Sequence, residues 1–119
     1  MAEKIIQRIN GLLKRNGFQT FVFDSPSKKN LFCFDLIVKK DDLVFIVKTF
    51  SNIDNIDNEM INGLKTLSEL LKSKPLLIGK KNRYQKLEEN TIYIRDELPF
   101  ITIGTLENIL EKGFYPYVL

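Results

Sequence analysis

Two charged side chains interrupt the apolar runs of residues 31–50, and their types allow chemistry. Asp35 lies within the apolar run 31–38, and Lys48 directly follows the apolar run 43–47. Burying a carboxylate or an ammonium alone is costly, so such groups are usually paired or held for a functional site. We therefore expect these two side chains either to pair with each other or to serve a site.

A second group of charges lies in the segment 80–86, which also contains Tyr84. Its basic residues could bind phosphate groups, and the tyrosine could stack on a base or a sugar. The alternative interpretation is a solvated loop in a lysine-rich chain. Two lysines near residue 28 form a weaker candidate of the same kind. The candidate nucleic-acid-binding residues are Lys28, Lys29, Lys80, Lys81, Arg83 and Lys86.

Composition excludes several classes of enzyme. The 119 residues contain no histidine, so histidine-based zinc sites, Ser-His-Asp triads and Cys-His dyads cannot form. The single cysteine, Cys33, lies in an apolar run and is interpreted as a core residue. No apolar run approaches the roughly 20 residues of a membrane span, so we expect a protein of the reducing cytoplasm. The net charge of +3 permits a nucleic-acid partner without requiring one.

The hairpin of residues 31–50 is expected to lie at the centre of a mixed sheet. Its two apolar runs are joined by the polar link 39–42, which predicts an antiparallel pair of central strands. Before this hairpin, the spacing of Ile and Leu predicts a helix over 2–16 that ends at Gly17. Residues 18–23 alternate as a first strand, which completes a meander of three strands.

The second half of the chain predicts one parallel strand and several smaller elements. A helix over 56–73 ends before Pro75, and 75–79 form a short buried strand. A helix between two strands is the usual connection of a parallel pair. The remaining expected elements of this single domain, residues 1–119, are strands at 91–94 and 100–103 and a helix at 106–112 that is capped by Thr105 and ended by Gly113.

This order of elements resembles the core of the restriction-endonuclease-like superfamily, whose motif is PD…(D/E)xK. Asp35 matches the Asp of the motif, and Ile46-Val47-Lys48 matches the (D/E)xK. Glu3, ahead of Gly17-Phe18, resembles the first-helix glutamate of archaeal Holliday-junction resolvases. The resemblance implies an α/β fold with a restriction-endonuclease-like core: a helix, a three-strand antiparallel meander, a helix and a parallel strand, with small C-terminal additions.

The resemblance also implies a chemistry, of which one part is missing. In the motif two carboxylates hold Mg²⁺, the metal polarises the phosphate and activates a water, and the lysine neutralises developing charge or orients that water. The second acidic position is Ile46, whose side chain cannot bind a metal. A metal-dependent DNA nuclease using Glu3, Asp35 and Lys48, with Glu3 and Asp35 on Mg²⁺, is therefore an alternative rather than the leading hypothesis.

The chain resembles more closely the N-terminal region of archaeal helix-turn-helix transcriptional regulators. In that family a nuclease-like domain without the second acidic position precedes a Cro/cI-type DNA-binding domain. The resemblance rests on four segments in the same order, 34–40, 45–48, 52–54 and 75–79. Nothing after Gly113 is expected to form a helix-turn-helix, so such a domain would follow residue 119.

The leading hypothesis is thus a non-catalytic domain of an archaeal-type transcriptional regulator, without a cofactor, that acts in dimerisation, ligand sensing or auxiliary DNA contact. It implies a homodimer, no membrane partner, and DNA contact that is weak or made through a following domain. The apolar stripe of the helix at 56–73 and the aromatic segment 114–119 are the candidate protein contacts. A stand-alone nucleic-acid-binding module remains a further alternative, and a small-molecule sensor would leave no signature in the sequence.

Overall fold

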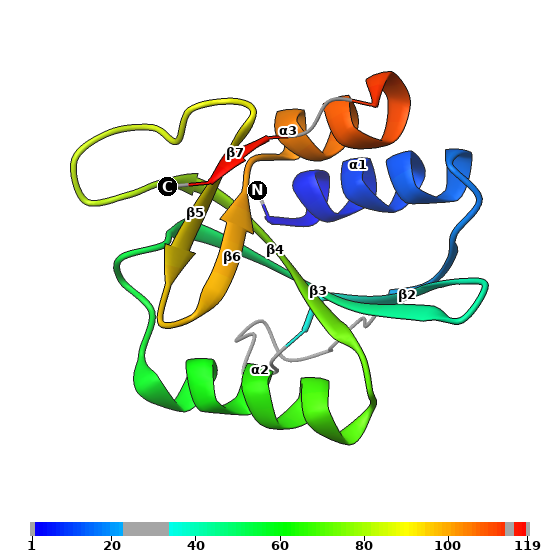
Figure 1. The fold of residues 1–119 in the computed structure, drawn as a ribbon, viewed down its shortest axis with the longest axis horizontal. Helices are drawn as coiled ribbons and strands as arrows, with labels where there is room; N and C mark the ends of the chain where they lie inside the picture. The colour runs from blue at the N-terminus through cyan, green and yellow to red at the C-terminus, as the bar shows by residue number, and fades with distance from the viewer. Residues whose placement is uncertain (1, 23–33, 114–115, 119) are drawn as a thin grey trace.

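The fold is a mixed sheet between two layers of helix, seen edge-on in Figure 1. The computed structural model describes residues 2–22, 34–113 and 116–118. Its elements are α1 (Ala2–Arg15), β1 (Gln19–Val22), β2 (Leu36–Lys40), β3 (Leu43–Asn52), α2 (Asn58–Leu70), β4 (Lys74–Lys81), β5 (Thr91–Arg95), β6 (Leu98–Ile101), α3 (Ile103–Glu107), a π-helical segment η1 (Asn108–Lys112) and β7 (Tyr117–Val118).

The described strands form one sheet in the order β1-β2-β3-β4-β6-β5-β7. The first three strands are an antiparallel meander, and β4 is parallel to β3 and to β6. The crossover helix α2 joins β3 to β4, as a parallel pair requires. The predicted fold class, a restriction-endonuclease-like α/β core with small C-terminal additions, is confirmed.

Each face of the sheet has its own apolar core, because alternate residues of a strand point to opposite faces. Helices α1 and α3 cover one face, which we call the α1 face, and α2 covers the other, the α2 face (Figure 1). Along β3, Val47 belongs to the core of the α1 face, whereas Ile46 belongs to that of the α2 face. Lys48 therefore shares the α2 face with Ile46.

Local sequence explains the chain reversal before the meander and the turn between β2 and β3. Helix α1 ends where Gly17 adopts a φ of 88°, and the Phe18 N–H closes the end of the helix by donating to the Leu13 carbonyl. The hairpin of β2 and β3 turns at Asp41 and Asp42, and Asp41 has a φ of 55°. Aspartate tolerates this left-handed backbone better than most residues. Both predicted positions are confirmed.

Helix α2 is shorter than the predicted range of 56–73. It begins after Asp57, whose carboxylate accepts from the Met60 N–H, and it ends at Leu70. Lys72 then takes a φ of 49°, which turns the chain toward β4 earlier than Pro75 alone would. Part of its apolar stripe packs into the core of the α2 face, namely Met60, Ile61, Leu64 and Leu67. Leu70 and Leu71 of the same stripe are exposed, so the proposed protein contact stays a prediction.

The last helix also begins earlier than predicted. Thr102, not Thr105, is the cap of α3, because its hydroxyl accepts from the Thr105 N–H at 3.0 Å. Thr105 lies inside α3, and its hydroxyl is 2.9 Å from that of Thr102. The end of η1 at Gly113, with a φ of 68°, agrees with the prediction.

Candidate functional site

The structure brings together Asp35 and Lys48, the two charged residues of the apolar hairpin. Asp35 lies in a bend directly before β2, and its N–H donates to the Val47 carbonyl at 2.7 Å, which holds it beside β3. Its Oδ1 lies 3.5 Å from the Lys48 Nζ, and the two side chains are only 2% and 6% exposed. Lys48 lies in the interior of β3, because the strand continues beyond the apolar run 43–47 to Asn52.

Thr49 completes this cluster, although the sequence analysis did not identify it. Asp35 Oδ2 accepts from the Thr49 N–H at 2.8 Å and from its hydroxyl at 3.0 Å. Both oxygens of the carboxylate are therefore engaged with β3, one with an ammonium and the other with two donors. The sequence contained one signal for Thr49, which is that it directly follows Lys48. A threonine at that position can donate to a carboxylate that pairs with the lysine.

Ile46 occupies the position where the motif needs its second carboxylate. Its side chain is fully buried in the core of the α2 face, in the same cluster as Leu64 of α2 and Leu77 of β4. A hydrocarbon side chain offers no ligand atom, and Mg²⁺ prefers carboxylate oxygens. Within the described residues, no group of three or more histidine, cysteine, aspartate or glutamate side chains could hold a metal ion. The residues present thus do not fit the magnesium site of the motif.

Glu3 belongs to the first turn of α1, which packs on the α1 face, opposite to the face of Ile46 and Lys48. The Glu3 side chain lies outside the described residues, and so do Lys28, Lys29 and Cys33. The roles predicted for these four residues stay predictions.

The basic segment 80–86 begins with the last two residues of β4 and continues into a turn that is held by hydrogen bonds. Asn82 Oδ1 accepts from the N–H groups of Tyr84 and Gln85, at 2.8 and 2.9 Å. Asp54 holds the turn from outside, since its Oδ2 accepts from the Arg83 N–H and its Oδ1 lies 2.6 Å from the Arg95 Nε. The Arg83 N–H, followed by the Arg95 side chain, lowers the pKa of Asp54 below its ordinary value.

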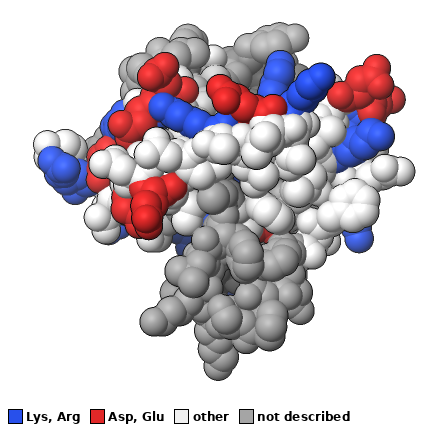
Figure 2. All heavy atoms as spheres, turned by 90° about the horizontal axis from the view of Figure 1, so that it is seen from below, with Lys and Arg blue, Asp and Glu red and all other residues white. Residues whose placement is uncertain are grey.

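The basic side chains of the segment 80–86 are accessible to solvent. Tyr84, in the turn, is 84% exposed. The four basic residues of the segment are exposed as well. Within the described part of the chain no carboxylate forms an ion pair with any of them: Lys80, Lys81, Arg83 and Lys86. On the side seen in Figure 2, basic and acidic side chains are interspersed and form no continuous basic surface.

Comparison with known proteins shows the family to which this chain belongs. The model of a PD-(D/E)XK superfamily domain matches residues 2–116. The chain belongs to the PD-(D/E)XK superfamily. A solved structure of a Holliday junction resolvase from Archaeoglobus fulgidus is similar with a TM-score of 0.52 over 67% of this chain and 68% of the resolvase, at 11% identity. This similarity concerns the fold alone, and it agrees with the core described above.

Curated relatives of this chain are longer archaeal proteins. A protein of Methanobrevibacter smithii is 36% identical over 117 residues, and one of Pyrococcus horikoshii is 32% identical over 116 residues. Both carry the name "Putative HTH-type transcriptional regulatory protein". The match covers 98% of this chain but 36% of each relative, so the chain spans about a third of their length. None of the described helices is long and apolar enough to cross a membrane.

Proposed function

We propose that this chain is a nuclease-fold domain that does not cleave nucleic acid and that acts as an accessory domain of an archaeal-type transcriptional regulator. The names of the relatives support the regulatory context. The observation that carries the proposal is the burial of Ile46 at the second acidic position of the motif, where its side chain is 0% exposed. Cleavage by a superfamily enzyme needs two carboxylates around one metal ion.

The state of Asp35 supports the same conclusion. The Asp35 carboxylate is buried, accepts two hydrogen bonds and pairs with an ammonium. It therefore has few oxygen lone pairs left for a metal ion. Replacing these partners by a metal would also leave the Lys48 ammonium buried without its counter-charge, which costs several kcal/mol. The pair therefore acts as a structural link between the segment before β2 and the interior of β3.

A cleavage assay tests this proposal directly. The chain is incubated with Mg²⁺ or Mn²⁺ and either branched or duplex DNA, beside an active Holliday-junction resolvase as the positive control. We expect no cleavage above the background given by Asp35→Ala. Metal-dependent cleavage that is lost in Asp35→Ala would overturn the proposal in favour of a nuclease with an atypical site. Homodimerisation is a further expectation of the accessory role, to be measured by sedimentation of the purified chain.

A second candidate function, auxiliary contact with nucleic acid, is favoured by the exposure of Tyr84. The side chain is 84% exposed on a turn whose backbone is fixed by Asn82 and Asp54. An exposed aromatic side chain in the same short segment as Lys81 and Arg83 has the composition of a stacking and phosphate-binding element. The contact would be small, because the turn offers only a few cations.

The salt dependence of DNA binding tests this second candidate. We expect weak binding at low salt, and the slope of log affinity against log salt should fall by about one for each phosphate that the protein no longer neutralises. Lys81→Gln/Arg83→Gln should reduce that slope and Tyr84→Ala should weaken binding to single strands, whereas the exposed control Lys74→Gln/Lys112→Gln should not. Absence of binding at low salt, or an equal loss in the control, would remove this candidate.

A further inference from the structure

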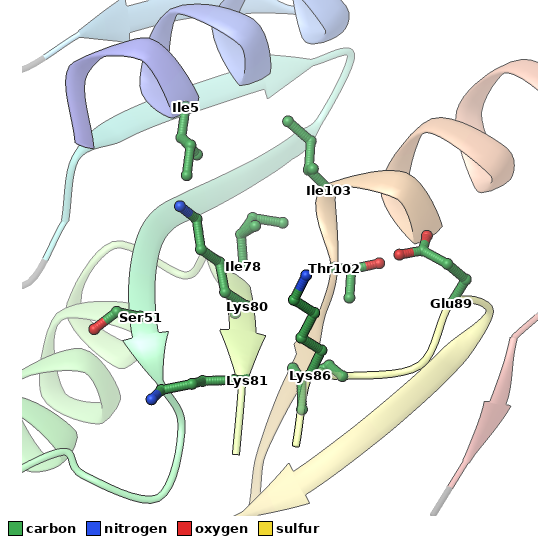
Figure 3. A pocket seen from close by; sticks show the side chains of 11 residues that line it. Ile5, Ser51, Ile78, Lys80, Lys81, Lys86, Glu89, Thr102 and Ile103 are labelled. Atoms are coloured by element: carbon green, nitrogen blue, oxygen red, sulfur yellow. The ribbon is translucent and has the colours of Figure 1, made fainter. Parts of the chain in front are cut away.

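A cavity of about 470 Å³ opens beside the carboxyl end of β4, away from the Asp35–Lys48 pair. Its wall is built by segments far apart in the sequence: α1, the end of β3, the end of β4, the segment after the basic turn, and the start of α3 (Figure 3). Ile78, Ile5 and Ile103 of this wall pack in the core of the α1 face. These three residues lie on the other side of the sheet from Ile46 and Lys48, whereas Leu87, which also lines the cavity, belongs to the core of the α2 face.

The floor of the cavity is apolar and its rim is basic. Four aliphatic side chains line it: Ile5, Ile78, Leu87 and Ile103. Lys80, Lys81 and Lys86 also line it. In Figure 3 the side chains of Lys80 and Lys86 extend toward the region between Ile5 and Ile103, whereas Lys81 extends in a different direction. An apolar surface next to two ammonium groups matches a molecule that is apolar at one end and anionic at the other.

The acidic residue of the wall does not neutralise these lysines. Glu89 directs its carboxylate to the first turn of α3, where a β-carbon added at Gly104 would collide with it. Within the described residues, neither Lys80 nor Lys86 forms an ion pair. The hydroxyl of Thr102 is already used as the cap of α3. The free positive charge at the rim is therefore available to a ligand.

We propose that this cavity binds a small organic anion, with a carboxylate or phosphate group held by Lys80 and Lys86 and an apolar body on the isoleucine and leucine floor. Its volume lies within the range of small-molecule sites, roughly 300–1,000 Å³, and is too small for a folded partner. This inference rests on the accessory role proposed above and gives it a ligand-sensing site. Its test uses no DNA and no divalent metal, so its failure is distinguishable from that of the cleavage assay.

The first measurement uses a pair of dyes that differ by one anionic sulfonate group. Anilinonaphthalene sulfonate carries an aromatic body and one anionic group, and N-phenylnaphthylamine has the same rings without the sulfonate. We expect the anionic dye to bind the chain about tenfold more tightly than the neutral one, since a charge-assisted contact contributes about that factor. Octanoate and phenyl phosphate should displace the anionic dye, whereas inorganic phosphate at the same concentration should not.

The second measurement places the dye in the cavity. Lys80→Gln/Lys86→Gln should weaken binding of the anionic dye about tenfold and leave that of the neutral dye unchanged, whereas the charge-matched control Lys74→Gln/Lys112→Gln should bind both dyes as the unmodified chain does. Amide chemical-shift changes should concentrate at Ile5, Leu87 and Ile103. Equal binding of both dyes, an unchanged affinity in Lys80→Gln/Lys86→Gln, or shift changes confined to exposed apolar residues such as Leu70 would overturn the proposal.

Discussion

The Asp35 carboxylate lies 3.5 Å from the Lys48 ammonium, and both side chains are almost completely buried. Together with the two hydrogen bonds from Thr49, this contact joins the segment before β2 to the interior of β3. In a superfamily whose motif assigns these residue types to catalysis, the same pair here has the geometry of a structural ion pair. Its energetics can be separated from any catalytic role.

Removing one partner of this pair should be more harmful than removing both. Lys48→Met leaves a buried carboxylate without its counter-charge, so we expect a loss of about 3–5 kcal/mol in the free energy of unfolding. The double variant Asp35→Asn/Lys48→Met leaves no buried charge, and its loss should be clearly smaller. Urea denaturation measures both. Lys74→Met, at an exposed position of β4, is the control, and a double variant as unstable as Lys48→Met would contradict the interpretation.

We expect the stability of Ile46→Glu, unlike that of the unmodified chain, to depend on a metal ion. The introduced carboxylate would share the α2 face with Lys48, in an apolar core, so we expect the variant to lose about 2–5 kcal/mol of stability. Mn²⁺ should recover part of this loss, because metal binding to the folded state stabilises it. Thermal melts with and without Mn²⁺ check this. If Mn²⁺ raises the melting temperature of the unmodified chain equally, Ile46 is not the missing metal position.

Gly79 should not tolerate even a methyl group. A β-carbon there would lie 2.5 Å from Ile53 Cγ2 and 3.1 Å from Leu87 Cδ1 in the core of the α2 face. Overpacking of this kind costs about 1–3 kcal/mol, which is the loss expected for Gly79→Ala in chemical denaturation. Gly11→Ala is the matched control. Nothing lies within 4 Å of the position that a methyl group would take at Gly11 on α1, so alanine should raise stability there by about 0.5–1 kcal/mol.

The hydrogen bonds of Asp54 should make stability depend on pH. Its pKa is lowered in the folded chain, mainly by the Arg83 N–H and then by the Arg95 side chain. The stabilisation is therefore complete above the ordinary aspartate pKa of about 3.9 and is lost as the pH falls through the lower, folded value. Asp54→Asn should cost about 1 kcal/mol near neutral pH and little in strong acid.

Urea titrations at several pH values measure the difference between Asp54→Asn and the unmodified chain. Asp42→Asn, in the exposed hairpin turn, serves as the control. A difference for Asp54→Asn that stays constant from neutral to acidic pH would show that charge on Asp54 contributes nothing.

The sequence predicted the frame of the fold well because its signals are local. Helical spacing and Gly17 located α1, and the two apolar runs with their polar link located the central hairpin. The ends of α2 and α3 were predicted less accurately, since Lys72 adopts a left-handed backbone and Thr102 caps a helix that follows its strand directly. Propensity does not fix such choices; packing of the neighbouring elements does.

The candidate site was predicted in part for the same reason. A lysine and an aspartate in apolar segments are expected to pair when both are buried, and Lys48 and Asp35 do pair with each other. Thr49 was missed because a single threonine in a strand gives no sequence pattern that reveals its hydrogen-bond partner. The cavity beside β4 was missed because its wall combines Ile5 with residues some 70 to 100 positions later, and no spacing within one element reveals such a meeting.

The alternation of β3 has a consequence for how this chain can evolve. Ile46 and Lys48 face one helical layer, whereas Ser51, which lines the cavity, lies on the opposite face of the same strand. Substitutions that erase metal ligands on one side need not disturb the wall of the cavity on the other. A strand can in this way lose metal-binding residues on one face while the residues of its other face continue to evolve independently.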